Sequence, residues 1–156
     1  MADPRIRRPP AQHDKLLAEL AGKDGPFRSA YDALMFATAL GKSKGRYTPY
    51  DLPGTGDAIR YSLLENRQYG DVLVDLIAAA EVPEDAKVLS DDRLDERLRI
   101  FEGYANGGLD YLQGELNLSG SRDLTAVVSA LVLAALTPPA GEAQPFGQDI
   151  LDALDW

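Results

Sequence analysis

The chain has 156 residues with 16 Lys/Arg, 25 Asp/Glu, one His and no Cys, for a formal net charge of -9. This length is enough for one domain with a genuine core, and a hydrophobic content of 45% argues against wholesale disorder. The lack of cysteine excludes disulfides, thiolate nucleophiles and cysteine metal sites, and it suits the cytoplasmic location that we expect.

Residues 1–10 contain three arginines and three prolines, and no apolar signal-peptide core follows them. Prolines restrict the backbone and remove hydrogen-bond donors, so we expect this segment to be an extended basic arm. A helix is predicted from Ala11 to Ala21, because Leu16, Leu17 and Leu20 fall on one helical face and Gly22 follows.

A second helix is predicted from Ser29 to Leu40, with Ala33, Phe36, Ala37 and Leu40 on one stripe and Gly41 as its stop. Residues 42–58 have the composition of a loop, with two prolines and three glycines. The segment 59–64 fits either a short strand or the start of a helix, and we favour the helix.

Tyr69 to Glu81 predicts a third helix, which Val82-Pro83 ends. Apolar residues then step by three or four positions from Leu94 to Leu116, the spacing of a long amphipathic helix. Asn106-Gly107-Gly108 lies inside this pattern, and a glycine pair is costly in a helix. We therefore expect either a bend at this point or two helices that meet there.

The stretch from Arg122 to Leu136 is the most hydrophobic, and we expect it at the centre of the core. Its apolar run is too short for the ~20 residues of a membrane span. Together these elements predict an all-α, compact domain of five to six helices over residues 11–137. Residues 138–156 are expected to form a Pro/Gly linker and a short acidic C-terminal helix.

Catalytic chemistry has little support in the sequence, and we expect neither an enzyme nor a cofactor. General acid–base catalysis usually uses histidine, and the one histidine, His13, is expected at the surface or at a rim. Gly54-Thr55-Gly56 lacks the Lys-Ser/Thr ending of a phosphate-binding loop. Asp91, Asp92, Asp95 and Glu96 could gather a cation, but the arginines between them favour surface ion pairs.

Charge is unevenly distributed along the chain, since residues 1–60 carry a net of +3 and residues 61–156 a net of -12. Either this division makes a solubilising surface, or different faces meet different partners. Aromatic side chains beside cations are typical of nucleic-acid contacts, although an exposed loop has the same composition. The candidate face for nucleic acid or an acidic partner consists of Arg5, Arg7, Arg8, Lys42, Lys44, Arg46, Tyr47 and Tyr50.

A second candidate surface lies at the C-terminus, where apolar residues line up opposite aspartates. This stripe either folds back onto the core or docks into the groove of a partner. Its residues are Ile150, Leu151, Leu154 and Trp156.

Two ordered strings resemble the signatures of the Dnd system-associated protein 4 family, also called DNA phosphorothioation-associated protein 4. One is residues 27–41, FRSAYDALMFATALG; the other is SDDRLDER at 90–97 followed by FEGYANGGL at 101–109. The likeness covers roughly residues 12–116, and the arm, the 119–136 segment and the acidic tail match poorly or lie outside it. No catalytic residue comes with this resemblance.

The resemblance implies a setting in bacterial anti-phage defence, where DNA phosphorothioation is linked to restriction as in restriction-modification systems. We therefore expect a non-catalytic accessory or adaptor protein that binds other proteins of a defence complex, with any contact to DNA being indirect. The alternatives are a small nucleic-acid-binding module that uses the arm and the 42–50 loop, or an acidic DNA mimic that regulates a nuclease or helicase. A metal-dependent hydrolase is the weakest alternative.

Overall fold

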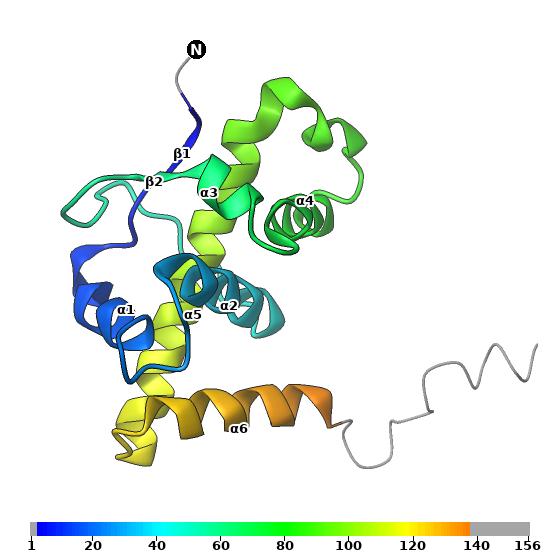
Figure 1. Ribbon diagram of the computed structural model, residues 1–156. Helices are drawn as coiled ribbons and strands as arrows, with labels where there is room; N and C mark the ends of the chain where they lie inside the picture. The colour runs from blue at the N-terminus through cyan, green and yellow to red at the C-terminus, as the bar shows by residue number, and fades with distance from the viewer. Residues whose placement is uncertain (1–2, 138–156) are drawn as a thin grey trace, which may run out of the picture.

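A computed structural model describes residues 3–137, and in this range the chain forms six α-helices and a small two-stranded ribbon (Figure 1). This confirms the prediction of an all-α domain. The predicted linker and C-terminal helix lie outside the described residues. In chain order the elements are β1 (Arg5–Ile6), the 3₁₀ turn η1 (Ala11–His13), α1 (Asp14–Leu20), α2 (Ala30–Ser43), β2 (Ile59–Arg60), α3 (Tyr61–Glu65), α4 (Gly70–Glu81), the 3₁₀ turns η2 (Ala86–Leu89) and η3 (Asp91–Arg93), α5 (Leu94–Ser119) and α6 (Leu124–Leu136).

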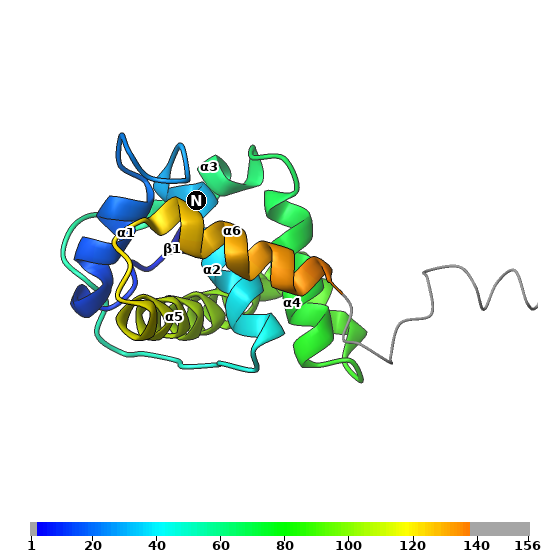
Figure 2. The same cartoon turned by 90° about the horizontal axis from the view of Figure 1, so that it is seen from below.

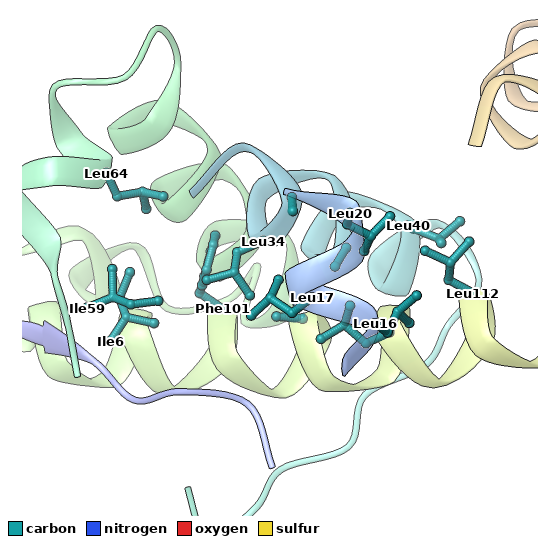
Figure 3. Packing of buried hydrophobic residues seen from close by; sticks show 14 of the residues in the cluster. Ile6, Leu16, Leu17, Leu20, Leu34, Leu40, Ile59, Leu64, Phe101 and Leu112 are labelled. Carbon is teal, nitrogen blue, oxygen red and sulfur yellow. The ribbon is translucent and has the colours of Figure 1, made fainter. Parts of the chain in front are cut away.

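Helix α5 is the axis of the molecule, and the other elements pack around it (Figure 1). Its apolar stripe includes Leu98, Phe101, Leu109 and Leu112, all of them fully buried. Figure 3 shows Phe101 and Leu112 pointing from α5 into the same core as the leucines of α1 and α2. The predicted Leu94-to-Leu116 pattern is thus one uninterrupted helix of 26 residues rather than two.

The glycines of α5 are tolerated because they allow α2 to approach closely. A Cβ placed on Gly108 would lie 1.8 Å from the carbonyl oxygen of Ala37, and one on Gly41 would lie 2.1 Å from that of Tyr104. Only residues without a side chain fit such a contact. Gly41, which we predicted as a helix stop, instead lies inside α2, and the packing against α5 carries this helix on to Ser43.

The N-terminal segment is extended and pairs with a distant part of the chain. β1 and β2 are antiparallel, with Arg5 opposite Arg60 and Ile6 opposite Ile59. Both isoleucines are buried, and Figure 3 shows them side by side within the core cluster. The segment 59–64 therefore contains both predicted alternatives, a two-residue strand followed at once by α3.

The prediction that the most hydrophobic helix forms the centre of the core is wrong. In α6 only Val128 is buried, while Leu133 and Leu136 are 64% and 74% exposed. The helix turns away from α5 at an angle of 111° and lies across the end of the body (Figures 1 and 2). Because α2 and α4 already pack on α5 and the leucines of α1 join the same core cluster, one face of α6 is enough to complete the core.

Among residues 3–137 no single helix has both the length and the hydropathy of a membrane span. Helix α6 meets those criteria only in combination with α5, from which it is sharply bent.

Candidate nucleic-acid and protein interfaces

The basic arm is anchored to α5 by Glu102, whose side chain is 1% exposed. Arg7 donates to it from the backbone nitrogen at 3.2 Å and from Nε at 2.6 Å, and Arg99 donates from Nη1 at 2.9 Å. Burial raises the pKa of Glu102, and the hydrogen bonds from Arg7 offset part of that rise. Arg99 also donates to the carbonyl oxygen of Arg5 at 3.0 Å, so α5 holds both ends of this short stretch.

Tyr50 joins the 42–50 loop to the arm. Its hydroxyl donates to the carbonyl oxygen of Arg7 at 3.0 Å, and the Arg7 guanidinium lies 4.9 Å from the centre of its ring. Burial raises the pKa of Tyr50 well above its ordinary value. The basic arm and the 42–50 loop, which we predicted as one face for nucleic acid, are thus in contact through Arg7 and Tyr50.

Lys42 is part of a compact polar cluster between α2, α4 and α5. Its ammonium donates to Glu81 at 3.3 Å and to the Tyr104 hydroxyl at 3.4 Å, and Tyr104 in turn donates to Glu81. Burial alone would lower the pKa of Lys42, but these hydrogen bonds outweigh it and the pKa is raised. Lys42 therefore links three helices instead of facing a ligand.

The remainder of the predicted loop face stays exposed. Lys44 and Arg46 both extend over the ring of Tyr111, at 5.3 Å and 5.9 Å from its centre. Tyr47 is 41% exposed and leans on the ring of Tyr104, with 4.9 Å between the ring centres. These three residues form a basic and aromatic strip along α5, whereas Arg8 of the arm donates to the carbonyl oxygen of Asp57.

Two arginines that the sequence analysis did not single out belong to the arm region. Arg60 lies directly opposite Arg5 on the ribbon, and Arg99 reaches the arm from α5. The sequence signal for this ribbon is an arginine next to an apolar residue in both segments, Arg5-Ile6 and Ile59-Arg60. Such alternation is typical of a strand with one face on the core. We refer to Arg5, Arg7, Arg60 and Arg99 as the arginine cluster.

His13 is buried, contrary to the expectation of a surface or rim histidine. It is 3% exposed, and its Nε2 lies 2.7 Å from Oδ1 of Asn106. Asn106 uses its Nδ2 to donate to the carbonyl oxygen of Thr48 at 2.8 Å, which leaves Oδ1 as the acceptor for His13. The docked arm brings η1 against α5, and this places the histidine in the interior.

The acidic segment 91–96 forms ion pairs, the alternative that its interleaved arginines favoured. Arg93 donates to Glu96 at 2.7 Å and to Asp85 at 2.7 Å, while Asp92 accepts from Ser90. Within residues 3–137 no group of three or more histidine, aspartate or glutamate side chains is placed to hold a metal ion.

The FEGYANGGL string, residues 101–109, is explained by contacts that position the arm and the 42–50 loop. Glu102 anchors Arg7, while the carbonyl oxygen of Gly103 accepts from the Thr48 backbone nitrogen at 3.0 Å. Asn106 holds the next carbonyl of the same loop, and a Cβ on Gly107 would lie 1.8 Å from the Arg46 carbonyl oxygen. A specific pattern of small and polar residues is therefore required along this face.

A protein-family model matches most of the chain. The model of the family described as DNA sulphur modification system-associated protein 4 matches residues 5–148. The chain belongs to this family. The match is longer than the resemblance suggested, because it includes the arm from Arg5 onward and all of α6. Searches of curated proteins and of solved structures found no match.

Membership of the DNA sulphur modification system-associated protein 4 family connects the chain with a DNA sulphur modification system. The family's match spans both surfaces described above, the arginine cluster and the exposed side of α6. Both surfaces therefore consist of residues that lie inside the matched region.

Proposed function

We propose that the protein is a non-catalytic accessory subunit that binds another protein of a DNA sulphur modification system through α6. The observation that carries this proposal is the exposure of an uncharged helix. From Leu124 to Leu136 there is no Asp, Glu, Lys or Arg, and Leu133 and Leu136 are largely exposed. Contiguous apolar surface of this kind is typical of protein interfaces.

Within residues 3–137, one face of α6 packs on the core and another face is left exposed. Partly or fully buried residues at helical spacing pack on the core: Leu124, Val127, Val128 and Leu131. Val132, Leu133 and Leu136 are exposed over the second half of the helix. A helix that presents apolar side chains in this way suits a hydrophobic groove on a partner.

The engagement of the candidate chemical groups supports a non-catalytic role. His13 is buried against Asn106, Lys42 is bound to Glu81, and Glu102 holds two arginines. Each of these side chains has a structural task that accounts for its position. The setting in anti-phage defence follows from the resemblance to phosphorothioation-associated proteins and is part of the same proposal.

The test is co-purification of the tagged chain with the individually expressed proteins encoded beside its gene. We expect the wild type to retain one of them and the double variant Leu133→Glu/Leu136→Glu to lose it. The matched control is Leu52→Glu/Leu76→Glu, which places the same charges on leucines that are 83% and 62% exposed elsewhere. This control should bind as the wild type does.

Two results would overturn the proposal. In one, both double variants retain the partner equally, so α6 is not the interface. In the other, light scattering shows a wild-type homodimer that Leu133→Glu/Leu136→Glu dissociates, while no neighbouring protein binds. The exposed side of α6 would then be covered by a second copy of the chain.

A further inference from the structure

We infer that the arginine cluster is a binding site for the phosphodiester backbone of nucleic acid. The inference concerns a surface distinct from α6, and it does not depend on the proposed partner. Its starting point is the register of the ribbon. Arg5 and Arg60 are direct partners in an antiparallel pair, so their side chains lie on the same face.

The opposite face of the ribbon is fixed by the core. Ile6 and Ile59 are 1% and 6% exposed and lie together in the core cluster (Figure 3). Because side chains alternate along a strand, Arg5 and Arg60 must project away from the core, and both are exposed. The face of the ribbon from which both arginines project is therefore fixed by their buried neighbours.

Two further guanidinium groups complete the cluster. Arg7 and Arg99 share the carboxylate of Glu102 and remain 31% and 38% exposed at their side chains. Arg99 is also tied to the carbonyl oxygen of Arg5, which places it beside the ribbon. Within residues 3–137, two carboxylates form hydrogen bonds or ion pairs at this corner: Glu102, and Asp3, which accepts from Ser62 at 2.8 Å. Four cations against two anions leave a local excess of positive charge.

The pairing of Arg5 with Arg60 brings two positive charges close together, and a bound anion would remove this repulsion. Like charges directly opposite each other on paired strands are destabilising, and Arg5 and Arg60 occupy such positions. An anion placed between them turns the repulsion into two attractions. Guanidinium groups match phosphate oxygens in pairs of parallel hydrogen bonds, so a phosphate is the anion that this geometry suits.

The net charge of -9 shapes how such a site would behave. The acidic part of the chain repels the backbone, so the site favours weak and local contact rather than binding along a whole face. Binding through phosphate contacts releases counterions, and the affinity therefore falls steeply with salt.

The experiment is fluorescence anisotropy of the full-length chain with a labelled DNA duplex, over a series of salt concentrations. We expect Arg5→Ala/Arg60→Ala to weaken binding by about tenfold or more at low salt and to reduce the log–log salt slope by about two. Arg5→Lys/Arg60→Lys keeps the charge but loses the forked donors, so it should keep the salt slope of the wild type and lose part of the affinity. The control Lys23→Ala/Arg28→Ala removes two exposed cations from the α1–α2 loop and should bind within about twofold of the wild type.

Melting curves of the same proteins without DNA guard against a folding artefact. Because relief of repulsion is expected, Arg5→Ala/Arg60→Ala should melt no lower than the wild type. The inference is overturned if the wild type does not bind the duplex, or if the control loses as much affinity as Arg5→Ala/Arg60→Ala. It is also overturned if a polyglutamate peptide competes as well as unlabelled DNA at equal charge, since the site would then be a general acidic-partner surface.

Discussion

Helices α5 and α6 follow each other in the chain, yet their compositions and their burial run in opposite directions. Helix α5 contains four glycines and many charged residues, and much of it is buried. Helix α6 has no charged residue, and most of its positions are exposed. For these two helices, the hydrophobicity of the sequence alone therefore does not decide which of them is buried. Helix α5 can occupy the centre because its glycines allow the backbone of α2 to approach closely.

The sharpest way to break this contrast is to fill the contact between α5 and α2. Gly108→Ala places a Cβ 1.8 Å from the backbone oxygen of Ala37, so the helices must separate. We expect the free energy of unfolding to fall by more than about 4 kcal/mol, at the upper end of single-substitution effects. Urea denaturation followed by circular dichroism measures this change.

Gly114→Ala is the matched control on the same helix, because nothing lies within 4 Å of a Cβ at that position. Alanine is a better helix former than glycine, and this variant should gain about 0.5–1 kcal/mol. If both substitutions shifted stability in the same direction, close approach would not be the reason for the glycines.

The same leucine-to-alanine change in each helix tests the contrast directly. Leu112 in α5 is fully buried and Leu133 in α6 is 64% exposed. We expect Leu112→Ala to lose about 2–5 kcal/mol and Leu133→Ala to change stability by no more than about 0.5 kcal/mol. Thermal and urea unfolding of the two variants provide the comparison, and similar losses would mean that the Leu133 side chain is covered in solution.

The smallest expected effect concerns the carboxylate buried on α5. Because burial raises the pKa of Glu102, the folded chain binds a proton there more readily than the unfolded chain. The stability of the wild type relative to Glu102→Gln should therefore increase as pH falls toward about 4.3, the ordinary value for glutamate, and decrease as pH rises through the raised pKa. Unfolding free energies of both proteins at several pH values measure the slope, and a flat difference would contradict the assignment.

Helical periodicity predicted α2, α4 and α5 because their buried stripes follow the sequence pattern closely. Where the prediction failed, the missing information was tertiary. Nothing local distinguishes Gly41 as a close-packing residue from Gly41 as a helix stop, and only the partner α5 decides. The hydrophobicity of α6 likewise indicates burial without indicating that the core is already enclosed.

The candidate site was predictable in its charges and not in its pairings. Arg5 and Arg7 stood out as part of a basic arm, but Arg60 and Arg99 join them only through the strand register and the turn of α5. Lys42 and Tyr50 matched the same composition rule and are used internally instead. Composition identified which residues could contact an anion, and long-range contacts decided which of them face outward.

The anchoring of Arg7 by Glu102 has a consequence for synthesis of the chain. The two residues are 95 positions apart, so the first strand leaves the ribosome long before its anchor exists. Because protein synthesis adds about 5–20 residues per second, Glu102 is synthesised roughly 5–20 s after Arg7. Throughout that interval Ile6 has no core to enter. Strand β1 therefore reaches its final packing only after α5 has been synthesised.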